Sequence, residues 1–526
     1  MVTLESILVL VSTLGYCSGL ATAYVSTGHP PDARQFPIPK GKPLLYEHDA
    51  TTWYKASTRP VGNLEDWIDL EKGLAFQYLL DNIAPNGANT EGCADGTVIA
   101  SPSKDHPNYF YQWIRDAAIT VQGVIDEYER SEDLALRDVV DRYADIQGAI
   151  QATFNPSGGF STGGLGEPKF MVDGAPFTGS WARPQRDGPA LRALTLMNFI
   201  RVVNQTHPEL VTLQWISRLY NPDLAAKSIV KSDLEYVSHH WDAIGFDLWE
   251  EIQDSHFFTA LVQHKALVQG RDLALSLDDH GAAEWYDGQQ VALKKLIKTE
   301  FWDGRNGHLK AYQYTPHRTG LDCSIMLGSI HGGQKDLYAP WSDEVLASTQ
   351  LFINQMQDLH PINKRKPPYY PEDERLRGAG IGRYVEDTYD GVRTSEGNPW
   401  FLCTSSVSSI FYTAIAHFID EGEFRITRTN RPFFNRLHPA GRAGLGRVSS
   451  SDPDFRNYLQ AMFTYADSFL NVIRYHAKVD GRLSEQFDKY DGFQRGAHDL
   501  TWSYGSFLMA ADKRQTARGM LFGSEY

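Results

Sequence analysis

Two short acidic segments, Asp247–Glu251 and Ser484–Asp488, combine carboxyl groups with large aromatic side chains. Hydrolysis of a glycosidic bond with inversion requires two carboxyl groups on opposite faces of the sugar ring. One protonates the leaving oxygen, and the other activates a water molecule. The two segments therefore supply candidates for both groups, Glu250 in the first and Glu485 in the second.

The first segment holds three carboxyl groups. Asp247 and Glu250 have i, i+3 spacing, so a helical turn would place them on one face with Glu251 beside them. Carboxylates that lie close together raise one another's pKa, which suits a general acid that stays protonated. A solvated acidic turn before a helix that starts near Phe257 explains the same residues, and the sequence leaves both interpretations open.

Two further segments place arginine and acidic side chains beside aromatic rings. In Tyr109–Asp116, an adjacent Arg and Asp can form hydrogen bonds with neighbouring hydroxyl groups of a sugar. The alternative is an ordinary helix N-terminus, where the helix dipole stabilises Asp116. In Gly179–Pro189, Trp181 is a candidate platform for a sugar ring, whereas the charged residues of the same loop can equally serve to brace it.

Other chemistries have little support in this sequence. It contains no phosphate-binding loop, no zinc-protease motif and no C-x-x-C pair. We interpret His239, His240 and His256 as structural residues rather than metal ligands. No metal and no organic cofactor are therefore expected.

Composition argues against some classes of partner. The chain of 526 residues has a formal net charge of -15 and lacks a long basic run, which argues against a nucleic-acid partner. An uncharged ligand is compatible with this balance, because it is bound by stacking and hydrogen bonds. Hydrophobic residues make up 42% of the chain, which is enough for a large core.

Three cysteines follow the N-terminal region, namely Cys93, Cys323 and Cys403. An odd number allows at most one disulfide within the chain. Because a domain of this size is stable without such a bond, buried free thiols are the expected state.

The N-terminus has features of a secretory signal over residues 1–23. An apolar run begins at Ile7, and the A-x-A pattern ends at Ala23, although Glu5 precedes the run and no Lys or Arg does. A cleaved signal is expected, while an uncleaved membrane anchor and a buried segment stay open. Residues 24–62 are expected to be an extended segment, and residues 63–526 to form one domain.

From Trp67 onward, apolar residues recur at helical spacing. We expect roughly eleven helices and few strands; beyond the first helix they lie at about 117–130, 134–153, 188–204, 226–243, 256–277, 281–300, 343–357, 400–420, 455–477 and 499–513. Residues 154–187 and 358–399 form long loops, which in a compact domain are usually functional. Every candidate motif lies in or beside a loop, so helices are expected to carry a site built by loops at one end.

Several ordered strings carry a resemblance to a known family. They are Tyr-Gln-Trp-Ile-Arg-Asp at 111–116, Gly-Glu-Pro-Lys-Phe at 166–170, Ser-Trp-Ala-Arg-Pro-Gln-Arg-Asp-Gly-Pro-Ala-Leu-Arg at 180–192, Gly-Phe-Asp-Leu-Trp-Glu-Glu at 245–251, Gly-Arg-Tyr-Val-Glu-Asp-Thr-Tyr at 382–389 and Ser-Glu-Gln-Phe-Asp-Lys-Tyr-Asp-Gly at 484–492. Together, from about Trp67 to Asp512, they resemble the fungal and yeast glucoamylases, glycoside hydrolase family fifteen. The resemblance implies an all-α fold, the (α/α)6 barrel (six-hairpin toroid).

The resemblance also implies roles for individual residues. Glu250 matches the general acid and Glu485 the general base, which we expect about 6.5–9.5 Å apart across a pocket. Asp247 matches a residue sometimes treated as the proton acceptor, but its closeness to Glu250 favours an electrostatic supporting role. The implied substrate contacts are Arg115 and Asp116 as a clamp on the terminal glucose, Trp181 as a partly exposed stacking residue, and Tyr109, Trp113, Glu251, Arg383 and Trp502.

This sequence departs from the family pattern at four positions, Met171, Phe177, Ala182 and Val385. None of them replaces the acid or the base. Phe177 lacks the hydroxyl group of the Tyr that is usual in the family. The resemblance therefore does not predict how tightly a sugar binds near this residue.

The implied enzyme is a secreted (extracellular or vacuolar) monomer that releases glucose from the non-reducing ends of starch, maltooligosaccharides or glycogen. It attacks α-1,4 bonds, and α-1,6 bonds more slowly, with inversion to β-glucose. No starch-binding domain is expected in the chain. Two alternatives stay open: a non-catalytic carbohydrate-binding or regulatory protein on the same barrel, and an enzyme for another glucosidic linkage, as in trehalose or dextran.

Overall fold

A computed structural model describes residues 63–223, 228–315, 317–365 and 371–523. All of them belong to one compact unit, Lys55–Tyr526. The expected signal over 1–23 and the extended segment over 24–62 lie outside the described residues.

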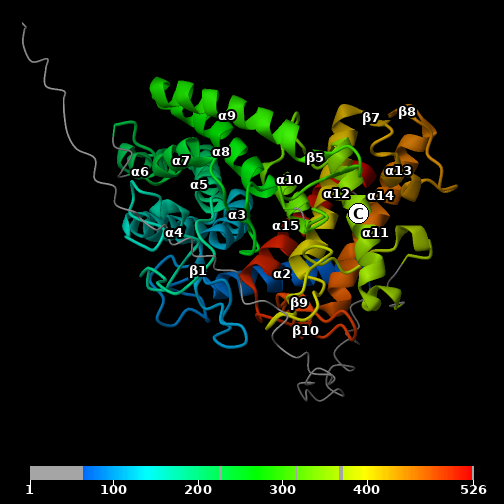
Figure 1. Cartoon of the computed structure of the whole chain (residues 1–526), viewed down its shortest axis with the longest axis horizontal. Coiled ribbons are helices and arrows are strands. Elements are labelled where there is room, and N and C mark those ends of the chain that lie inside the picture. Colours follow the sequence, from blue (N-terminus) through cyan, green and yellow to red (C-terminus); the bar gives the residue numbers. More distant parts are fainter. Residues whose placement is uncertain (1–62, 224–227, 316, 366–370, 524–526) are drawn as a thin grey trace, which may run out of the picture. The chain divides into compact units, whose positions relative to one another are not determined.

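Six helices form a closed inner ring (Figure 1). Each packs against the next in the order α3, α5, α8, α10, α12, α15, and α15 packs against α3. Their bounds are α3 (Ile114–Ser131), α5 (Asp187–Thr206), α8 (Phe257–Ser276), α10 (Cys323–Gly332), α12 (Phe401–Glu421) and α15 (Thr501–Phe522).

Six outer helices alternate with the inner ones along the chain, and each packs on the outside of an inner helix. Their bounds are α2 (Leu64–Asp81), α4 (Leu134–Ala152), α7 (Ile229–His240), α9 (His280–Glu300), α11 (Asp343–Leu359) and α14 (Pro453–His476). Alternation of outer and inner helices around a closed ring is the expected (α/α)6 barrel. It also directs all six inner helices the same way, so their N-termini meet at one end.

The helices α14 and α12 illustrate how the distribution of polar and apolar residues follows from a helix's position in the barrel. The outer helix α14 has one apolar face and one polar face, which suits a helix with one side in solvent. The inner helix α12 buries every residue of its first three turns. The buried residues include five Ser and Thr side chains, whose hydroxyl groups donate to backbone carbonyl groups. Among the described residues, only α12 is long and apolar enough to span a membrane, but 78% of its apolar window is buried inside the protein.

The remaining elements are short. Two extra helices are α6 (Leu213–Leu219) and α13 (Arg431–Leu437). Five antiparallel two-stranded sheets lie in the loops, formed by β1 (Gln112–Trp113) with β2 (Lys169–Phe170), β3 (Gly245–Phe246) with β4 (Gln253–Asp254), β5 (Trp302–Asp303) with β6 (His308–Leu309), β7 (Glu423–Ile426) with β8 (Gly446–Ser449), and β9 (Gln486–Phe487) with β10 (Gln494–Arg495). Four single 3-10 turns complete the described elements, at 164–166, 208–210, 361–364 and 374–376.

Two sequence-based expectations about local structure are wrong. Cys323 and Cys403 form a disulfide, with Cα atoms 5.8 Å apart, instead of staying free thiols. They start two adjacent inner helices, so the barrel brings together residues that are far apart in the sequence. Asp247–Glu251 forms no helical turn, because it lies in the hairpin turn between β3 and β4.

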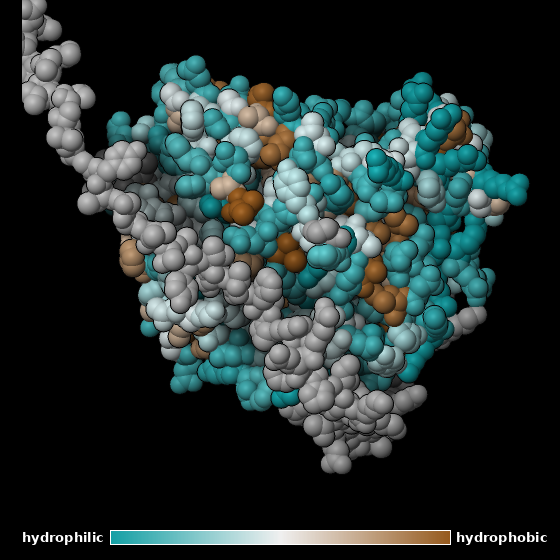
Figure 2. All heavy atoms as spheres, in the orientation of Figure 1, coloured by the Kyte–Doolittle hydropathy of each residue, from teal (hydrophilic) through white to brown (hydrophobic). Residues whose placement is uncertain are grey.

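On the face shown in Figure 2, the described residues present no large continuous apolar area. The side shown in Figure 2 is mostly hydrophilic, with apolar residues in small separate patches. The largest exposed fractions among apolar side chains belong to Leu213 and Phe154, which lie in different parts of the chain.

Candidate active site

Glu250 lies in the turn between β3 and β4 with a φ of 68°, a left-handed conformation that is rare for residues other than glycine and is often found at functional sites. Its Oε1 accepts hydrogen bonds from Trp113 Nε1 at 2.7 Å and from Gln185 Nε2 at 2.9 Å. The side chain is 18% exposed. Loops from three parts of the chain thus hold a carboxyl group that solvent still reaches.

The predicted clamp residues lie beside Glu250. Arg115 Nη1 donates to Gln185 Oε1 at 2.8 Å and to Asp187 Oδ2 at 2.9 Å, while its Nη2 is 3.9 Å from Glu250 Oε1. Burial raises the pKa of the neighbouring Asp116 to about 6, against the charge of Arg115. These buried side chains can offer both donors and acceptors to the hydroxyl groups of a sugar.

Glu251 has partners different from those of Glu250. Arg383 Nη2 donates to its Oε1 at 2.8 Å, Arg318 Nη2 donates to its Oε2 at 2.9 Å, and the Tyr384 hydroxyl also donates to Oε2. Burial opposes ionisation of Glu251, but these partners together hold its pKa below the usual value. Arg383 is fixed in turn by Asp387, at 2.7 Å. Glu251 is therefore a fixed negative charge.

Asp247 braces the turn that carries Glu250. Its Oδ1 accepts from the backbone N–H groups of Glu251 at 2.7 Å and Ile252 at 2.8 Å. Burial raises its pKa to about 7. The charge of the neighbouring Glu251 raises this pKa, as expected of clustered carboxylates, but burial is the larger cause. In the hairpin turn, each of the three carboxyl groups has its own partners.

Glu485 is fully buried immediately before β9. Its Oε2 accepts from the Tyr389 hydroxyl at 3.3 Å, whereas its Oε1 has no hydrogen-bond partner among the described residues. Burial raises its pKa to about 8, against the effects of Tyr109 and Arg383. Gly496 packs against this carboxyl group with a φ of 72°, and a side chain there would collide with Oε2. Glu485 therefore has one buried carboxyl oxygen that pairs with none of the described side chains in the ligand-free protein.

Tyr109 connects the two halves of the site. After burial, the charge of Glu485 and then that of Glu250 contribute to raising the pKa of its phenol, so both carboxyl groups lie close to it. Its ring packs on Trp113 with centroids 5.4 Å apart. The barrel therefore brings Glu250 and Glu485 together around one phenol, although they are far apart in the sequence.

The two remaining predicted aromatic residues differ in exposure. Trp181 is partly exposed and packs edge-on to Trp113, with centroids 6.1 Å apart. The partial exposure of Trp181 agrees with the expectation for a stacking residue. The side chain lies beside Trp113, which donates to Glu250. Trp502 is only 4% exposed, and its ring lies 5.8 Å from the Arg115 guanidinium. Trp502 thus packs against Arg115 of the proposed clamp and has little exposed surface for a ligand.

Sequence reasoning gave no specific role to Gln185, Tyr389 or Lys169. Gln185 and Tyr389 hold the two candidate catalytic carboxyl groups, and Lys169 lies beneath the aromatic residues next to Glu250. All three are in or beside the strings that carry the family resemblance. Only the fold shows which side chains they contact.

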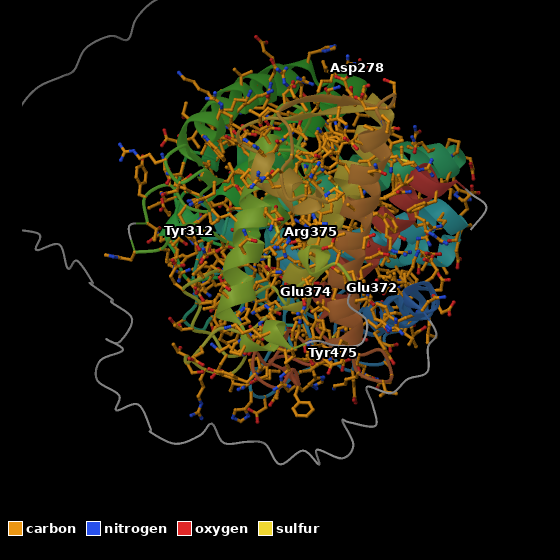
Figure 3. All side chains as sticks on the ribbon, turned by 90° about the vertical axis from the view of Figure 1, so that its right-hand side faces the viewer. Asp278, Tyr312, Glu372, Glu374, Arg375 and Tyr475 are labelled. Atoms are coloured by element: carbon orange, nitrogen blue, oxygen red, sulfur yellow. A yellow bond between two sulfur atoms is a disulfide. The ribbon has the colours of Figure 1, made fainter. Side chains whose placement is uncertain are left out.

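A second set of contacts anchors the Glu250 turn to the barrel. Asp322, the residue before α10, accepts from Trp249 Nε1 at 3.0 Å and from the Tyr312 hydroxyl at 2.9 Å. Tyr312 is labelled in Figure 3. Trp249 also packs on Trp400, with centroids 5.7 Å apart. The residue next to the candidate acid is therefore fixed to an inner helix.

The histidines lie elsewhere in the fold. His256 is buried directly before α8, and burial lowers its pKa to about 4, so it is neutral. His239 and His240 end α7. Within the described ranges, no group of three or more His, Cys, Asp or Glu side chains is arranged to hold a metal ion.

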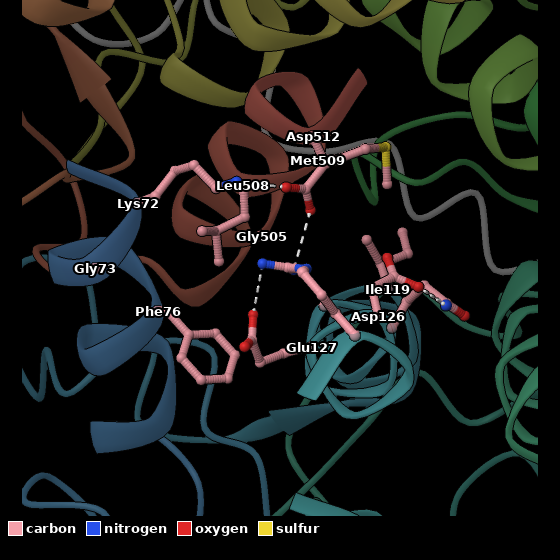
Figure 4. Close-up of a pocket in the computed structure, with 13 residues that line it drawn as sticks. Lys72, Gly73, Phe76, Ile119, Asp126, Glu127, Gly505, Leu508, Met509 and Asp512 are labelled. Carbon is pink, nitrogen blue, oxygen red and sulfur yellow. Dashed lines mark hydrogen bonds and ion pairs between the residues drawn. The ribbon is translucent and has the colours of Figure 1, made fainter. Parts of the chain in front are cut away.

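A cavity of about 250 Å³ lies away from both candidate carboxyl groups, between α2, α3 and α15 (Figure 4). Its charged groups are largely paired with one another: Lys72 with Asp512 at 2.8 Å, and Arg130 with Glu127 at 2.9 Å. None of the predicted site residues lines it.

Comparisons of sequence agree with this geometry. Residues 73–512 match the family model described as glycosyl hydrolases family 15. A probable glucoamylase of Schizosaccharomyces pombe is 36% identical over 460 residues, which cover 87% of this chain and 93% of the relative. A glucoamylase of Saccharomycopsis fibuligera is also 36% identical, over 87% of this chain and 92% of the relative.

Solved structures give the same result. The glucoamylase of Saccharomycopsis fibuligera superposes with a TM-score of 0.79 at 34% identity, over 88% of this chain and 99% of that one. The family 15 glucoamylase of Hypocrea jecorina has a TM-score of 0.78 at 36% identity, over 86% of this chain and 72% of that one.

Proposed function

The chain belongs to glycosyl hydrolase family 15, and on that basis we propose that Glu250 and Glu485 are its catalytic pair. The protein acts as a glucoamylase, an inverting exo-glucosidase that releases glucose from starch. Glu250 protonates the glycosidic oxygen, and Glu485 takes a proton from the attacking water. The product is then β-glucose, because the bond that is cleaved has the α configuration.

One observation carries this proposal: Tyr109 links two carboxyl groups that come from distant segments. Its hydroxyl lies 3.3 Å from the Tyr389 hydroxyl, which donates to Glu485, and its ring packs on Trp113, which donates to Glu250. Glu250 remains partly exposed, and Glu485 has an unpartnered Oε1. A carbohydrate-binding protein without activity has no need of a buried carboxyl group with one oxygen left unpaired.

The surroundings of the two carboxyl groups do not by themselves divide the roles. Trp113 and Gln185 donate hydrogen bonds to Glu250, whereas burial raises the pKa of Glu485 to about 8 in the ligand-free protein. A base must be ionised when it accepts a proton. During reaction, positive charge develops at the anomeric carbon and a water molecule occupies Oε1, and both favour ionised Glu485. The reverse assignment is the second candidate, and the raised pKa is the observation that favours it.

The residues around Glu250 support a site for the terminal sugar of a glucan. Arg115 and Asp116 are the proposed clamp on its hydroxyl groups, and Glu251 and Arg383 are proposed as further substrate contacts. Tyr109 and Trp181 provide partly exposed aromatic surface, while the buried Trp113 orients Glu250 through its Nε1. Trp502 lies behind Arg115, and Asp247 supports the acid through its turn. Starch and maltooligosaccharides are the substrates, and we extend the proposal to glycogen, to slower cleavage of α-1,6 bonds and to a monomeric enzyme.

We also propose that the enzyme is secreted. The disulfide between Cys323 and Cys403 supports this, because such bonds persist in oxidising compartments and are rare in the cytosol. The apolar N-terminal run with its A-x-A pattern agrees with export. Mass spectrometry of the protein from culture medium tests the proposal, since a mature N-terminus after Ala23 is expected.

The function is tested by proton NMR of the glucose first formed from methyl α-maltoside, whose blocked reducing end contributes no free glucose anomers of its own. We expect the signal of the β-anomer before mutarotation, and faster turnover of maltose than of isomaltose, trehalose or dextran. An α-anomer signal, or a preference for another linkage, would overturn the assignment. Absence of any glucose release would favour a binding protein on the same barrel.

A further inference from the structure

Four aromatic rings beside Glu250 form a closed box. Successive rings around the box are Tyr111, Phe177, Trp181 and Trp113, and the fourth packs against the first. Neighbouring centroids lie 5.4 to 6.1 Å apart. The interplanar angles are 75°, 84°, 64° and 86°, so each ring meets its neighbour nearly edge-to-face.

The ammonium group of Lys169 occupies this box. Its Nζ lies 3.1 Å from the ring centroid of Trp181, 4.1 Å from that of Phe177, 4.4 Å from that of Tyr111 and 4.7 Å from that of Trp113. Lys169 is 1% exposed. Aromatic faces attract a cation within about 6 Å, and a box of several rings is the arrangement that binds ammonium ions in other settings.

Local structure explains why the lysine enters the box. Lys169 and Trp113 are directly paired residues of the two-stranded sheet β1–β2. In the box, Trp113 is also the residue whose Nε1 donates to Glu250. A displacement of the lysine therefore acts on Trp113 and, through one hydrogen bond, on the proposed acid.

We propose that Lys169 is a positioning residue of the active site, which fixes Trp181 and Trp113 through cation–π contacts and so orients the sugar platform and Glu250. This rests on the proposed function of those residues. One face of Trp181 is covered by the ammonium group, so only its other face is available to a sugar. The four rings thus act as a rigid wall, and a sugar binds against it rather than inside it.

The charge of Lys169 is sensitive to pH. Burial lowers its pKa to about 8, while the charge of Glu250 opposes this most, Arg183 adds to the lowering and Glu167 opposes it. Loss of the proton removes the cation–π attraction between the ammonium group and the four rings. The box is therefore expected to loosen as the pH rises through about 8.

The experiment compares Lys169→Arg, which stays charged, with Lys169→Met, which is never charged. Lys265→Met is the matched control, because Lys265 is also buried with its pKa lowered by burial to about 8, but donates to the His331 carbonyl on another part of the barrel. Tryptophan fluorescence is titrated from pH 6 to 9.5 without ligand. For this titration only, each protein also carries Glu485→Gln, because the pKa of Glu485 is about 8 as well. KM and kcat are then measured for maltotriose at pH 6.

We expect an emission change with a midpoint near pH 8 when both lysines are present and in Lys265→Met, and no such change in either Lys169 variant. At pH 6, Lys169→Met should raise KM for maltotriose about threefold or more, and Lys169→Arg should raise it less. A transition that survives in Lys169→Arg, or an unchanged KM in Lys169→Met, would overturn the proposal. The titration needs no activity, so its outcome is independent of the proposed function.

Discussion

At the scale of single residues, the carboxyl groups of the site differ in burial and in hydrogen-bond partners because they lie in different loops. Glu250 lies in a partly exposed hairpin turn and receives donors from two loops. Glu485 is buried beside Gly496, and Glu251 lies between two arginines. Because each environment comes from the fold, the sequence identifies the carboxyl groups but predicts their protonation poorly.

The raised pKa of Glu485 makes a testable prediction for stability. A folded-state pKa near 8 means that the folded protein keeps a proton which the unfolded chain loses above about pH 4.3. Between these values the wild type therefore loses stability as the pH rises. Glu485→Gln removes this loss, so its Tm relative to the wild type should increase between pH 4 and pH 8, by a few degrees.

Glu251→Gln provides the control of opposite sign. The pKa of Glu251 is held below its usual value, so its charge stabilises the folded state above the unfolded pKa. This contribution is lost as the pH falls through the folded pKa. The Tm of Glu251→Gln relative to the wild type should therefore decrease as the pH rises from acid. If the Tm differences of Glu251→Gln and Glu485→Gln from the wild type changed with pH in the same direction, the opposite pKa shifts of the two carboxyl groups would be contradicted.

At this scale, functional residues could be predicted from the sequence where they are adjacent in the chain. They could not be predicted where the site depends on contacts between distant segments. The pair Arg115 and Asp116 could be recognised from the sequence, and both lie beside Glu250. The box around Lys169 could not, because Tyr111 and Trp113 come from one segment, whereas Phe177 and Trp181 come from a loop far along the sequence.

At the scale of elements, the inner helices position the site because their N-termini meet at one end of the barrel. The disulfide links two of these ends, since Cys323 begins α10 and Cys403 lies in the first turn of α12. Asp322 and Trp400, which hold the Glu250 turn, directly precede these two helices. The bond therefore lies in the wall that supports the proposed acid.

Removal of the disulfide should reduce stability strongly. It closes a loop with a sequence separation of 80 residues, and restriction of the unfolded chain by such a loop contributes about 4 kcal/mol. We expect the Cys323→Ser, Cys403→Ser double variant to have a lower free energy of unfolding by about this amount in urea titration. Cys93→Ser is the control, because Cys93 is a free thiol. Equal stability of the double variant and the control would exclude this role.

Close approach of α10 to α8 gives another prediction. A Cβ atom on Gly332 would lie 2.5 Å from the backbone of Leu261, so the two inner helices cannot accept even a methyl group there. Gly332→Ala should cost about 1–3 kcal/mol of unfolding free energy. Gly73→Ala on the exposed side of α2 meets nothing within 4 Å and should instead stabilise by about 0.4–1 kcal/mol. Thermal unfolding of both variants measures the difference, and equal shifts would argue against tight helix packing here.

Helix prediction was most accurate for long elements and least accurate for short ones. The expected helices at 134–153 and 281–300 agree with α4 and α9 to within one or two residues. Helix α10 was not predicted, because a ten-residue apolar segment has the same pattern as a buried strand. The Asp247 turn was read as helical because i, i+3 spacing alone cannot distinguish a helix from a hairpin turn.

At the scale of the whole molecule, periodicity predicts many helices but not how they close. The (α/α)6 barrel followed from the resemblance to family 15, and the alternation of inner and outer helices confirms it. Closure of the ring is what brings the segments around Glu250 and Glu485 to one end. This arrangement is set by long-range packing, which leaves no local signal in the sequence.

The division of roles between Glu250 and Glu485 is the central claim, and an activated substrate tests it most directly. α-Glucosyl fluoride needs little help from an acid, because fluoride is a good leaving group, but its hydrolysis still needs a base for the water. On maltose, Glu250→Gln and Glu485→Gln should each lose about 10²–10⁴-fold in kcat. On α-glucosyl fluoride, Glu250→Gln should recover most of its activity and Glu485→Gln should not. Recovery by Glu485→Gln instead, or by neither variant, would contradict the assignment of Glu250 as acid and Glu485 as base.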